Sequence, residues 1–253
     1  MTRKIISIHS FRGGTGKSNT TANVAVQLGN MGLRVGVVDT DIQSPGIHVL
    51  FGLGSQDISR SLNDFLWNRC EITEAAYDTS IDLNIQAPGA VFLIPSSVEV
   101  DEIVNVLREG YDVSLLTDGF KKLLEELALD VLLIDTHPGL NEETLFSIAI
   151  SNSLAVVMRP DHQDYEGTGV TVEVARSLGV PGIHLVVNKV PAAFDHDKVS
   201  SRVCDAYSLS DVTVIPHSDD LMNLASEGIF SVRFPHHPLT EQYRNLANAL
   251  VNS

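Results

Sequence analysis

The feature that most constrains this chain is a glycine-rich loop at residues 10–18, which reads Ser-Phe-Arg-Gly-Gly-Thr-Gly-Lys-Ser. An apolar run at Lys4–His9 predicts a strand before the loop, and residues 17–31 predict a helix after it. Glycines let the backbone fold tightly, so that successive N–H groups point at phosphate oxygens, and the start of a helix adds partial positive charge. Lys17 can reach the β- and γ-phosphates of a nucleotide, and the Ser18 hydroxyl can bind Mg²⁺. The loop therefore predicts a nucleotide site rather than a plain glycine-rich turn.

The rest of the chain alternates between apolar runs and helical patterns. Further strands are expected at residues 34–39, 91–94, 130–135, 154–158, 184–187 and 212–215. Helices are expected at residues 99–108, 114–128, 163–178, 195–207, 218–227 and 239–251. Because the strands are apolar throughout rather than alternating, helices must cover both faces, which predicts an α/β fold with a mostly parallel, doubly wound sheet.

Length and composition favour a single domain over residues 1–253. With 43% hydrophobic residues, the chain can bury one sizeable core. The segment 52–88 is the least regular part and could carry a family-specific insertion.

Acidic residues stand where two of these strands end. Ligands of such sheets bind beyond the carboxyl ends of the strands. Asp39 and Asp41 follow one strand, and a carboxylate beside a γ-phosphate can orient and polarise an attacking water. Asp135 ends the strongly apolar strand 130–135, which is the Walker B arrangement, where the carboxylate holds Mg²⁺ directly or through water. The alternative is that Asp39 and Asp41 only end a strand in a polar turn.

The loop sequence R-G-G-T-G-K-S resembles the deviant Walker A loop of the MinD/ParA family, which usually reads K-G-G-x-G-K-[ST]. An ordinary Walker A loop has glycine where this chain has Phe11. The similarity runs from about residue 3 to residue 251 and implies a P-loop ATPase domain that binds and hydrolyses ATP with Mg²⁺, slowly and under stimulation by a partner. It implies that the nucleotide is bound by Gly13, Gly14, Thr15, Gly16, Lys17, Ser18 and Asn19.

The resemblance also assigns roles in the two switch regions. Asp41 corresponds to the switch I aspartate implicated in hydrolysis, while Asp39 and Ser18 join Asp135 around Mg²⁺. In switch II, Gly139 could supply flexibility and an N–H for the γ-phosphate. His137 stands where the family commonly has a small residue or proline, and we interpret it as a solvated turn histidine or as a modulator of switch II.

Two later loops predict a base pocket. The Asn188 amide both donates and accepts, so it can pair with an adenine edge, and the family uses an asparagine here. Residues 215–220 resemble the family's next adenine-contacting loop, which places Pro216 at the base. The guanine-specific signature [NT]-K-x-D is absent, because Pro191 stands two residues after Lys189. Together these loops favour adenine.

Arg12 is the main departure from the family pattern. The family has a lysine here, which reaches across a dimer to the partner's nucleotide. Arginine keeps the charge and adds a planar fork that binds phosphate with two hydrogen bonds, although the two residues are not interchangeable. We therefore expect an ATP-dependent homodimer in which Arg12 acts in trans and joins Asp41 and Lys17 in catalysis. The alternative is that Arg12 contacts only its own chain's phosphate or solvent.

The output of the ATPase stays open between two classes. The first is a positioning or partitioning ATPase that works on DNA or membrane. The formal net charge of −15 weakens the DNA interpretation, because phosphate contacts need clustered cations. The basic residues available near the C-terminal part are Lys198, Arg202, Arg233 and Arg244. Membrane binding is less favoured, since the apolar stripe at 239–251 carries Arg244 alone, and we interpret it as a helix packed on the core.

The second class is a soluble switch or carrier in protein or metallocluster maturation. Mrp-type iron–sulfur carriers share part of the switch I pattern, but they need a CxxC motif. Cys70 and Cys204 stand far apart, so we expect no iron–sulfur cluster. No apolar run approaches the roughly 20 residues of a membrane span. We expect a cytoplasmic protein, with association to the nucleoid as one alternative.

Overall fold

Within residues 3–210 and 212–253, which the computed structural model describes, eight strands form one sheet in the order β3-β4-β2-β5-β1-β6-β7-β8. All neighbouring strands pair in parallel except β3, which runs antiparallel to β4 at one edge. The strands are β1 Lys4–His9, β2 Arg34–Asp39, β3 Tyr77–Asp78, β4 Ala90–Ile94, β5 Val131–Asp135, β6 Ser153–Met158, β7 Gly182–Val190 and β8 Val212–Pro216. The mostly parallel sheet is confirmed.

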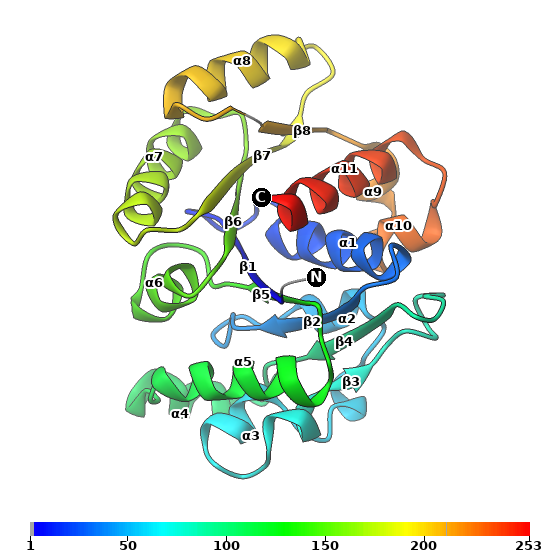
Figure 1. Ribbon diagram of the computed structural model, residues 1–253, viewed down its shortest axis with the longest axis vertical. Coiled ribbons are helices and arrows are strands. Elements are labelled where there is room, and N and C mark those ends of the chain that lie inside the picture. The colour runs from blue at the N-terminus through cyan, green and yellow to red at the C-terminus, as the bar shows by residue number, and fades with distance from the viewer. Residues whose placement is uncertain (1–2, 211) are drawn as a thin grey trace.

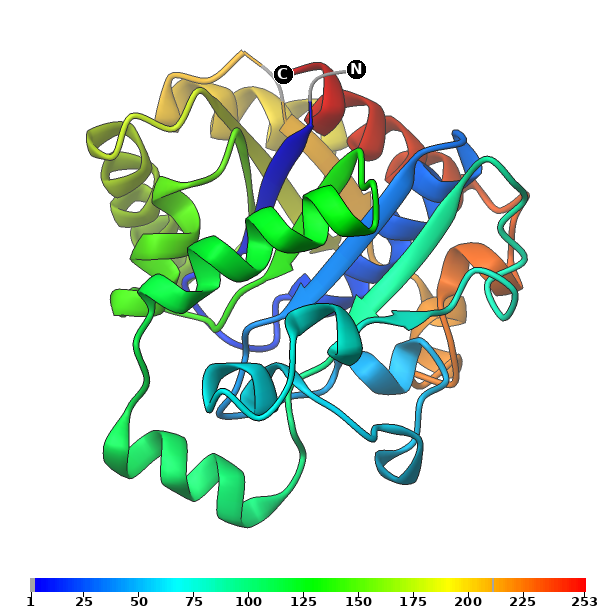
Figure 2. The same ribbon diagram turned by 60° about the horizontal axis from the view of Figure 1, so that its bottom comes forward.

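Helices cover both faces of this sheet (Figure 1). The α-helices are α1 Lys17–Asn30, α2 Ile47–Leu50, α3 Leu62–Leu66, α4 Val100–Glu109, α5 Ser114–Glu126, α6 Glu142–Ala149, α7 His162–Ser177, α8 His196–Tyr207, α9 Asp219–Asn223, α10 Phe230–Arg233 and α11 Pro238–Asn252, with short 3₁₀ helices at Ser55–Asp57 and Ile72–Ala75. α1, α10 and α11 pack on one face, while α3 and α5 cover one half of the other face and α7 and α8 cover the rest. Figure 2 shows α5 lying across the sheet and α4 standing away from it.

Alternate residues of one strand enter different cores, which explains the continuous apolar runs. In β5, Leu133 packs into the cluster under α1 and α11, whereas Leu132 and Ile134 pack into the cluster under α3 and α5. Each of these side chains is fully buried. A strand with only one covered face would alternate with polar residues, so the doubly wound arrangement and the sequence pattern have the same cause.

The structure differs from the expected elements most clearly at α9 and α6. The helix expected at 218–227 is wrong in length: α9 ends at Asn223, because Ala225 and Ser226 adopt positive φ angles of 48° and 66°. α6 was not predicted at all, although Asn141 caps its first turn by accepting a hydrogen bond from the backbone N–H of Thr144. The irregular segment 52–88 holds only short elements and β3.

The C-terminal helix α11 packs against α1 inside the fold. Its apolar stripe is buried, and Tyr243, Leu246 and Leu250 are all 0% exposed. The interpretation of this stripe as a core-packed helix is therefore confirmed. In the described part of the chain, no helix combines the length and apolar character that crossing a membrane requires.

Candidate functional site

The phosphate loop joins β1 to α1 at the carboxyl edge of the sheet, as the sequence predicts. Gly14 and Gly16 adopt left-handed φ angles of 77° and 96°, which favour glycine. A Cβ on Gly16 would lie 2.3 Å from Nδ2 of Asn188, so no side chain fits there. Within the described residues, the buried hydroxyl of Thr15 has no hydrogen-bond partner. A tight loop with an unused polar group at its centre fits a phosphate ligand.

Lys17 and Asp135 form a buried ion pair at the base of this loop. Lys17 Nζ lies 2.9 Å from Asp135 Oδ1, and the two side chains are 7% and 1% exposed. The hydroxyl of Thr21 donates to the same oxygen at 2.8 Å. The structure thus brings together the predicted phosphate-binding lysine and the predicted Mg²⁺ ligand.

Asp39 lies beside this pair, because β2 and β5 place Asp39 and Asp135 in register. It is fully buried, and its Oδ2 has no hydrogen-bond partner within residues 3–210 and 212–253. Burial, reinforced by the charge on Asp135, raises the pKa of Asp39 well above its usual value. Once both are ionised, the carboxylates of Asp39 and Asp135 outnumber the one ammonium of Lys17. The site therefore fits a divalent cation that prefers hard oxygen ligands.

The protein side chains alone do not enclose a metal. Within the described residues, no group of three or more His, Cys, Asp or Glu side chains is arranged to hold an ion. Mg²⁺ is usually held by one or two carboxylates together with substrate phosphates and waters. Asp39, Asp135 and the hydroxyl of Ser18 fit that kind of shared site.

The two loops predicted to act as switches approach each other beside the phosphate loop. Asp41 in switch I accepts hydrogen bonds at Oδ1 from the backbone N–H and the hydroxyl of Ser44, at 3.2 and 3.0 Å. His137 in switch II places Nε2 3.8 Å from the same oxygen. The backbone N–H of Gly139 donates to the Ser10 carbonyl at 3.0 Å, and Gly139 has a φ of 84°. Switch II therefore rests on the phosphate loop, with Asp41 close by.

Arg12 points to its own chain. Its NH1 lies 3.3 Å from Asp164 Oδ1 and 3.6 Å from Asp161 Oδ1, both at the start of α7. Asp164 is 2% exposed and also accepts from the backbone N–H of Arg159 at 2.8 Å. Sequence reasoning missed these partners, although an aspartate before α7 is a visible N-cap signal. The predicted trans role of Arg12 stays a prediction.

Phe11 makes a second contact between the phosphate loop and α7. A Cβ added to Gly167 would lie 2.0 Å from Cδ1 of Phe11, so the aromatic ring rests directly on the backbone of α7. Two consecutive loop residues, Phe11 and Arg12, are therefore coupled to one helix.

The two predicted base-pocket residues, Asn188 and Pro216, lie in different places. Asn188 is 2% exposed and packs behind the phosphate loop, where its Nδ2 donates to the Thr15 carbonyl at 2.8 Å. Its Oδ1 accepts from the backbone N–H of Lys189 at 2.8 Å, which leaves one amide hydrogen for another partner. Pro216 ends β8 and lines a separate cavity of about 530 Å³ beside His217, to which no phosphate-loop residue contributes. Adenine contacts by Asn188 and Pro216 stay predictions.

Two titratable side chains near the site had not been singled out from the sequence. His9 is buried at the end of β1, where burial, aided by the charge of Lys17, lowers its pKa to about 3. Burial raises the pKa of Glu143 on α6 to about 7, and the charge on Asp41 adds to the rise. Their positions beside the motifs are visible in the sequence. Their burial, which shifts their pKa values, depends on the tertiary fold and is not visible there.

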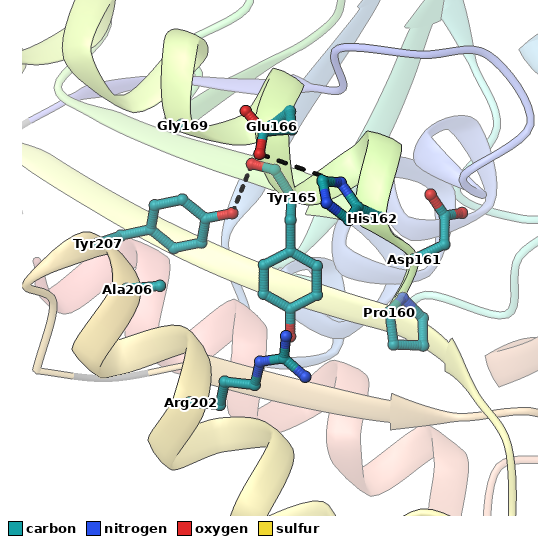
Figure 3. A pocket seen from close by; sticks show the side chains of 9 residues that line it. All are labelled: Pro160, Asp161, His162, Tyr165, Glu166, Gly169, Arg202, Ala206 and Tyr207. Atoms are coloured by element: carbon teal, nitrogen blue, oxygen red, sulfur yellow. Dashed lines mark hydrogen bonds and ion pairs between the residues drawn. The ribbon is translucent and has the colours of Figure 1, made fainter.

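A cavity of about 510 Å³ opens between α7 and α8, away from the phosphate loop (Figure 3). Tyr165 and Tyr207 stack with ring centroids 6.3 Å apart, and the Arg202 guanidinium lies 5.1 Å from the Tyr165 ring centroid. Asp161, which contacts Arg12, also lines this cavity. Asp161 therefore lies both in this cavity and beside Arg12 of the phosphate loop.

Comparison with known proteins places this geometry in a family context. Residues 3–178 match the family described as the AAA domain. An uncharacterized ATP-binding protein of Methanocaldococcus jannaschii is 26% identical over 252 residues, covering 98% of this chain and 88% of that protein. An iron–sulfur cluster carrier protein of Pyrococcus furiosus is 29% identical over 192 residues, covering 72% of this chain and 60% of that protein.

A solved structure shares the fold over nearly the whole chain. The septum site-determining protein MinD of Pyrococcus horikoshii, solved in complex with Mg-ADP, superimposes with a TM-score of 0.80. The match covers 98% of this chain and 95% of that chain at 24% identity. The chain thus has an established fold.

Proposed function

Since this chain belongs to the AAA domain family and to its MinD/ParA-type ATPases, we propose that it is an ATP-driven switch that forms a sandwich dimer and positions or partitions a cargo. The observation that carries the ATPase part is the buried constellation of Lys17, Asp135 and Asp39 beneath a glycine loop. Burying these three ionisable groups costs folding stability, and that cost is hard to explain in a protein that binds no ligand there.

Each residue has a distinct task in this proposal. The backbone N–H groups of residues 13–18 bind the phosphates, and Lys17 stabilises the charge that develops on the γ-phosphate. Ser18, Asp39 and Asp135 hold Mg²⁺, which supplies positive charge against the phosphate oxygens. Asp41 orients the attacking water.

Arg12 supports the dimer part of the proposal. Its guanidinium is partly exposed, with 39% of the side chain accessible, and among the described residues it is held by the carboxylates of Asp161 and Asp164 at the start of α7. Once released, it can form two hydrogen bonds with a phosphate group of the partner's nucleotide. In this proposal Arg12 pairs with Asp164 in the monomer. In the dimer it gives up that ion pair and contacts the nucleotide of the partner.

Molar mass in solution tests the switch. We would measure it by light scattering with ADP and with ATP plus Mg²⁺, for the wild type, Asp41→Ala and Arg12→Ala. We expect the mass to double with ATP, most stably in Asp41→Ala, and to stay monomeric in Arg12→Ala despite retained ATP binding. A wild type that is monomeric under every condition would remove the dimer, and a nucleotide-independent dimer would remove assembly as the output.

The surface on which the dimer works can be tested with the same samples. The buried stripe of α11 is not available to a membrane in this fold. Lys198 pairs with Asp195 and Arg244 with Glu241, so two of the candidate basic residues are already next to acids. We propose DNA ahead of membrane, and salt-sensitive, ATP-dependent retention on DNA but not on liposomes is the expected result.

A soluble carrier function is the second candidate. It is favoured by the similarity to an iron–sulfur cluster carrier protein. Cys70 lies in the loop after α3 and Cys204 lies on α8, so the two cysteines offer no paired ligands. A role as a nucleotide switch for one protein client, without a cluster, fits this better. ATP-dependent binding to a protein client, with retention on neither DNA nor liposomes, would favour it.

A further inference from the structure

His137 is fixed in one orientation by its own loop. Its Nδ1 lies 2.6 Å from the carbonyl oxygen of Pro138. A carbonyl oxygen only accepts, so Nδ1 carries a hydrogen and donates it. In the neutral ring, Nε2 is then an acceptor with its lone pair directed away from Pro138.

Nε2 of His137 lies close to an atom of the other switch loop. Nε2 of His137 and Oδ1 of Asp41 are 3.8 Å apart, which is too long for a direct hydrogen bond. Ser44 holds the Asp41 carboxylate in place through two hydrogen bonds. Two acceptors from different switch loops therefore lie close together without a direct hydrogen bond.

The gap between these two atoms lies at the phosphate loop. The Gly139 N–H is bonded to the Ser10 carbonyl, and a Cβ on Gly13 would lie 4.0 Å from Cγ of Pro138. The segment containing His137 is thus held against residues 10–13 of the phosphate loop. A water in the gap would stand beside the group that is transferred.

We propose that Nε2 of His137 and the carboxylate of Asp41 together hold the water that attacks the γ-phosphate, a role that rests on the proposed ATPase function. A water with hydrogen bonds of about 2.8 Å to two acceptors separates them by about 4.5 Å, so the two side chains, 3.8 Å apart in the ligand-free protein, move slightly apart when they hold it. Its two hydrogens point at His137 and Asp41, which leaves an oxygen lone pair for phosphorus. His137 departs from the pattern of the family that the chain resembles, which commonly has a small residue or proline there.

The reaction balances with both residues acting by position. The water oxygen forms a bond to the γ-phosphorus, and the bond from phosphorus to the β–γ bridging oxygen breaks, with its electron pair leaving on ADP. One water hydrogen stays on the attacking oxygen. The other passes to a phosphate oxygen and is released as the phosphate ionises. Neither side chain needs to change its charge.

Two variants of His137 show whether activity needs an acceptor at the position of Nε2 or only a polar side chain. Glutamine is long enough to present an acceptor near the position of Nε2, whereas asparagine reaches only as far as Nδ1. We expect His137→Asn to lower kcat about 10- to 100-fold with KM unchanged, and His137→Gln to stay within about fivefold of the wild type. An equal kcat in wild type and His137→Asn, or equal losses in both variants, would overturn the proposal.

Binding of phosphate analogues gives a readout that does not depend on turnover. ADP with beryllium fluoride imitates the bound substrate, whereas ADP with aluminium fluoride imitates the transition state with its in-line water. We expect His137→Asn to bind the beryllium fluoride complex like the wild type and the aluminium fluoride complex at least tenfold more weakly. Loss of both would indicate a structural role and overturn the proposal, and unchanged binding of both would overturn it too.

The double variant completes the test. If the two residues hold one water, His137→Asn should lower kcat little further in an Asp41→Ala background. Independent, additive losses would contradict a shared water. A wild type without ATPase activity would instead remove the proposed function itself, before any variant is compared.

Discussion

Asp39 is the residue whose burial has the largest consequence for the ligand-free protein. Its carboxylate is 0% exposed, stands beside Asp135, and has an oxygen without a hydrogen-bond partner among the residues the structure describes. A group in this state lowers stability until a cation arrives, because its desolvation is not compensated. The ligand-free protein is therefore less stable than it could be because Asp39 is placed for a ligand, as is common in active sites.

Replacing Asp39 therefore has opposite effects with and without ligand. We expect Asp39→Asn to raise the free energy of unfolding of the ligand-free protein by about 1–3 kcal/mol, since the amide removes the cost of keeping an acid with a raised pKa in a buried site. The stabilisation that Mg²⁺ and ATP give the wild type should be largely lost. Thermal unfolding with and without Mg²⁺-ATP measures both.

The matched control is Asp82→Asn, the same change at an exposed position. It should leave both quantities within about 0.5 kcal/mol of the wild type. A ligand-free Asp39→Asn protein less stable than the wild type would contradict the prediction.

At the scale of elements, α7 is coupled to the phosphate loop through Phe11 as well as Arg12. The Phe11 ring occupies the place of a Cβ on Gly167. We expect Gly167→Ala to force the ring away and to weaken ATP binding at least fivefold, with a loss of about 1–3 kcal/mol in stability from overpacking. Calorimetric titration and denaturant unfolding measure the two effects.

A second variant shows whether the clash is the cause. Phe11→Ala removes the ring, so Gly167→Ala should cost much less in that background, and the two changes should be non-additive. Additive losses would mean that Gly167 matters for helix geometry alone. Gly169 lies on the same helix, and the atom nearest to a Cβ added there would be 3.6 Å away, which is an ordinary contact. Gly169→Ala is therefore the matched control, with little effect expected on ATP binding.

The elements were predicted to different degrees, for identifiable reasons. Apolar runs such as 130–135 gave the parallel strands, because burial on both faces leaves a plain signature. The sequence pattern does not indicate α6, because the helix begins with Glu142 and Glu143 directly after a predicted switch loop, where the sequence is polar and irregular. α9 was overextended because nothing in the local sequence marks the positive φ angles that Ala225 and Ser226 adopt in the fold.

The same division applies to the site. Local motifs located Lys17 and Asp135, and the structure joins them in one ion pair. The partners of Arg12 could not be found in this way, because Asp164 lies far along the chain and only the tertiary fold brings it near. Spatial neighbours without a shared motif leave no signal in a single sequence.

For the molecule as a whole, His9 makes stability depend on pH. Its pKa falls from 6.5 in the unfolded chain to about 3 in the fold. Between these values the unfolded chain binds more protons, so the contribution of His9 to stability falls as the pH falls below 6.5. The slope from this group is about 1.4 kcal/mol per pH unit once the pH is well below that value.

Comparison with a variant isolates this effect from other acid-sensitive groups. We expect the stability of the wild type relative to His9→Gln to decrease steadily between about pH 7.5 and pH 5. His162→Gln, at a side chain that is 87% exposed, should show no such trend. Denaturant unfolding at several pH values measures the difference, and a constant difference would contradict the assignment.

The contact between Phe11 and Gly167 also bears on how such chains diverge. An ordinary Walker A loop has glycine at the position of Phe11, which would leave the space above α7 free for a side chain at position 167. The two positions should therefore covary among relatives, a bulky residue at one occurring with glycine at the other. A lineage that moves the bulky residue from one position to the other has to pass through glycine at both positions. The alternative intermediate, with a bulky residue at both, would place two side chains in the same space.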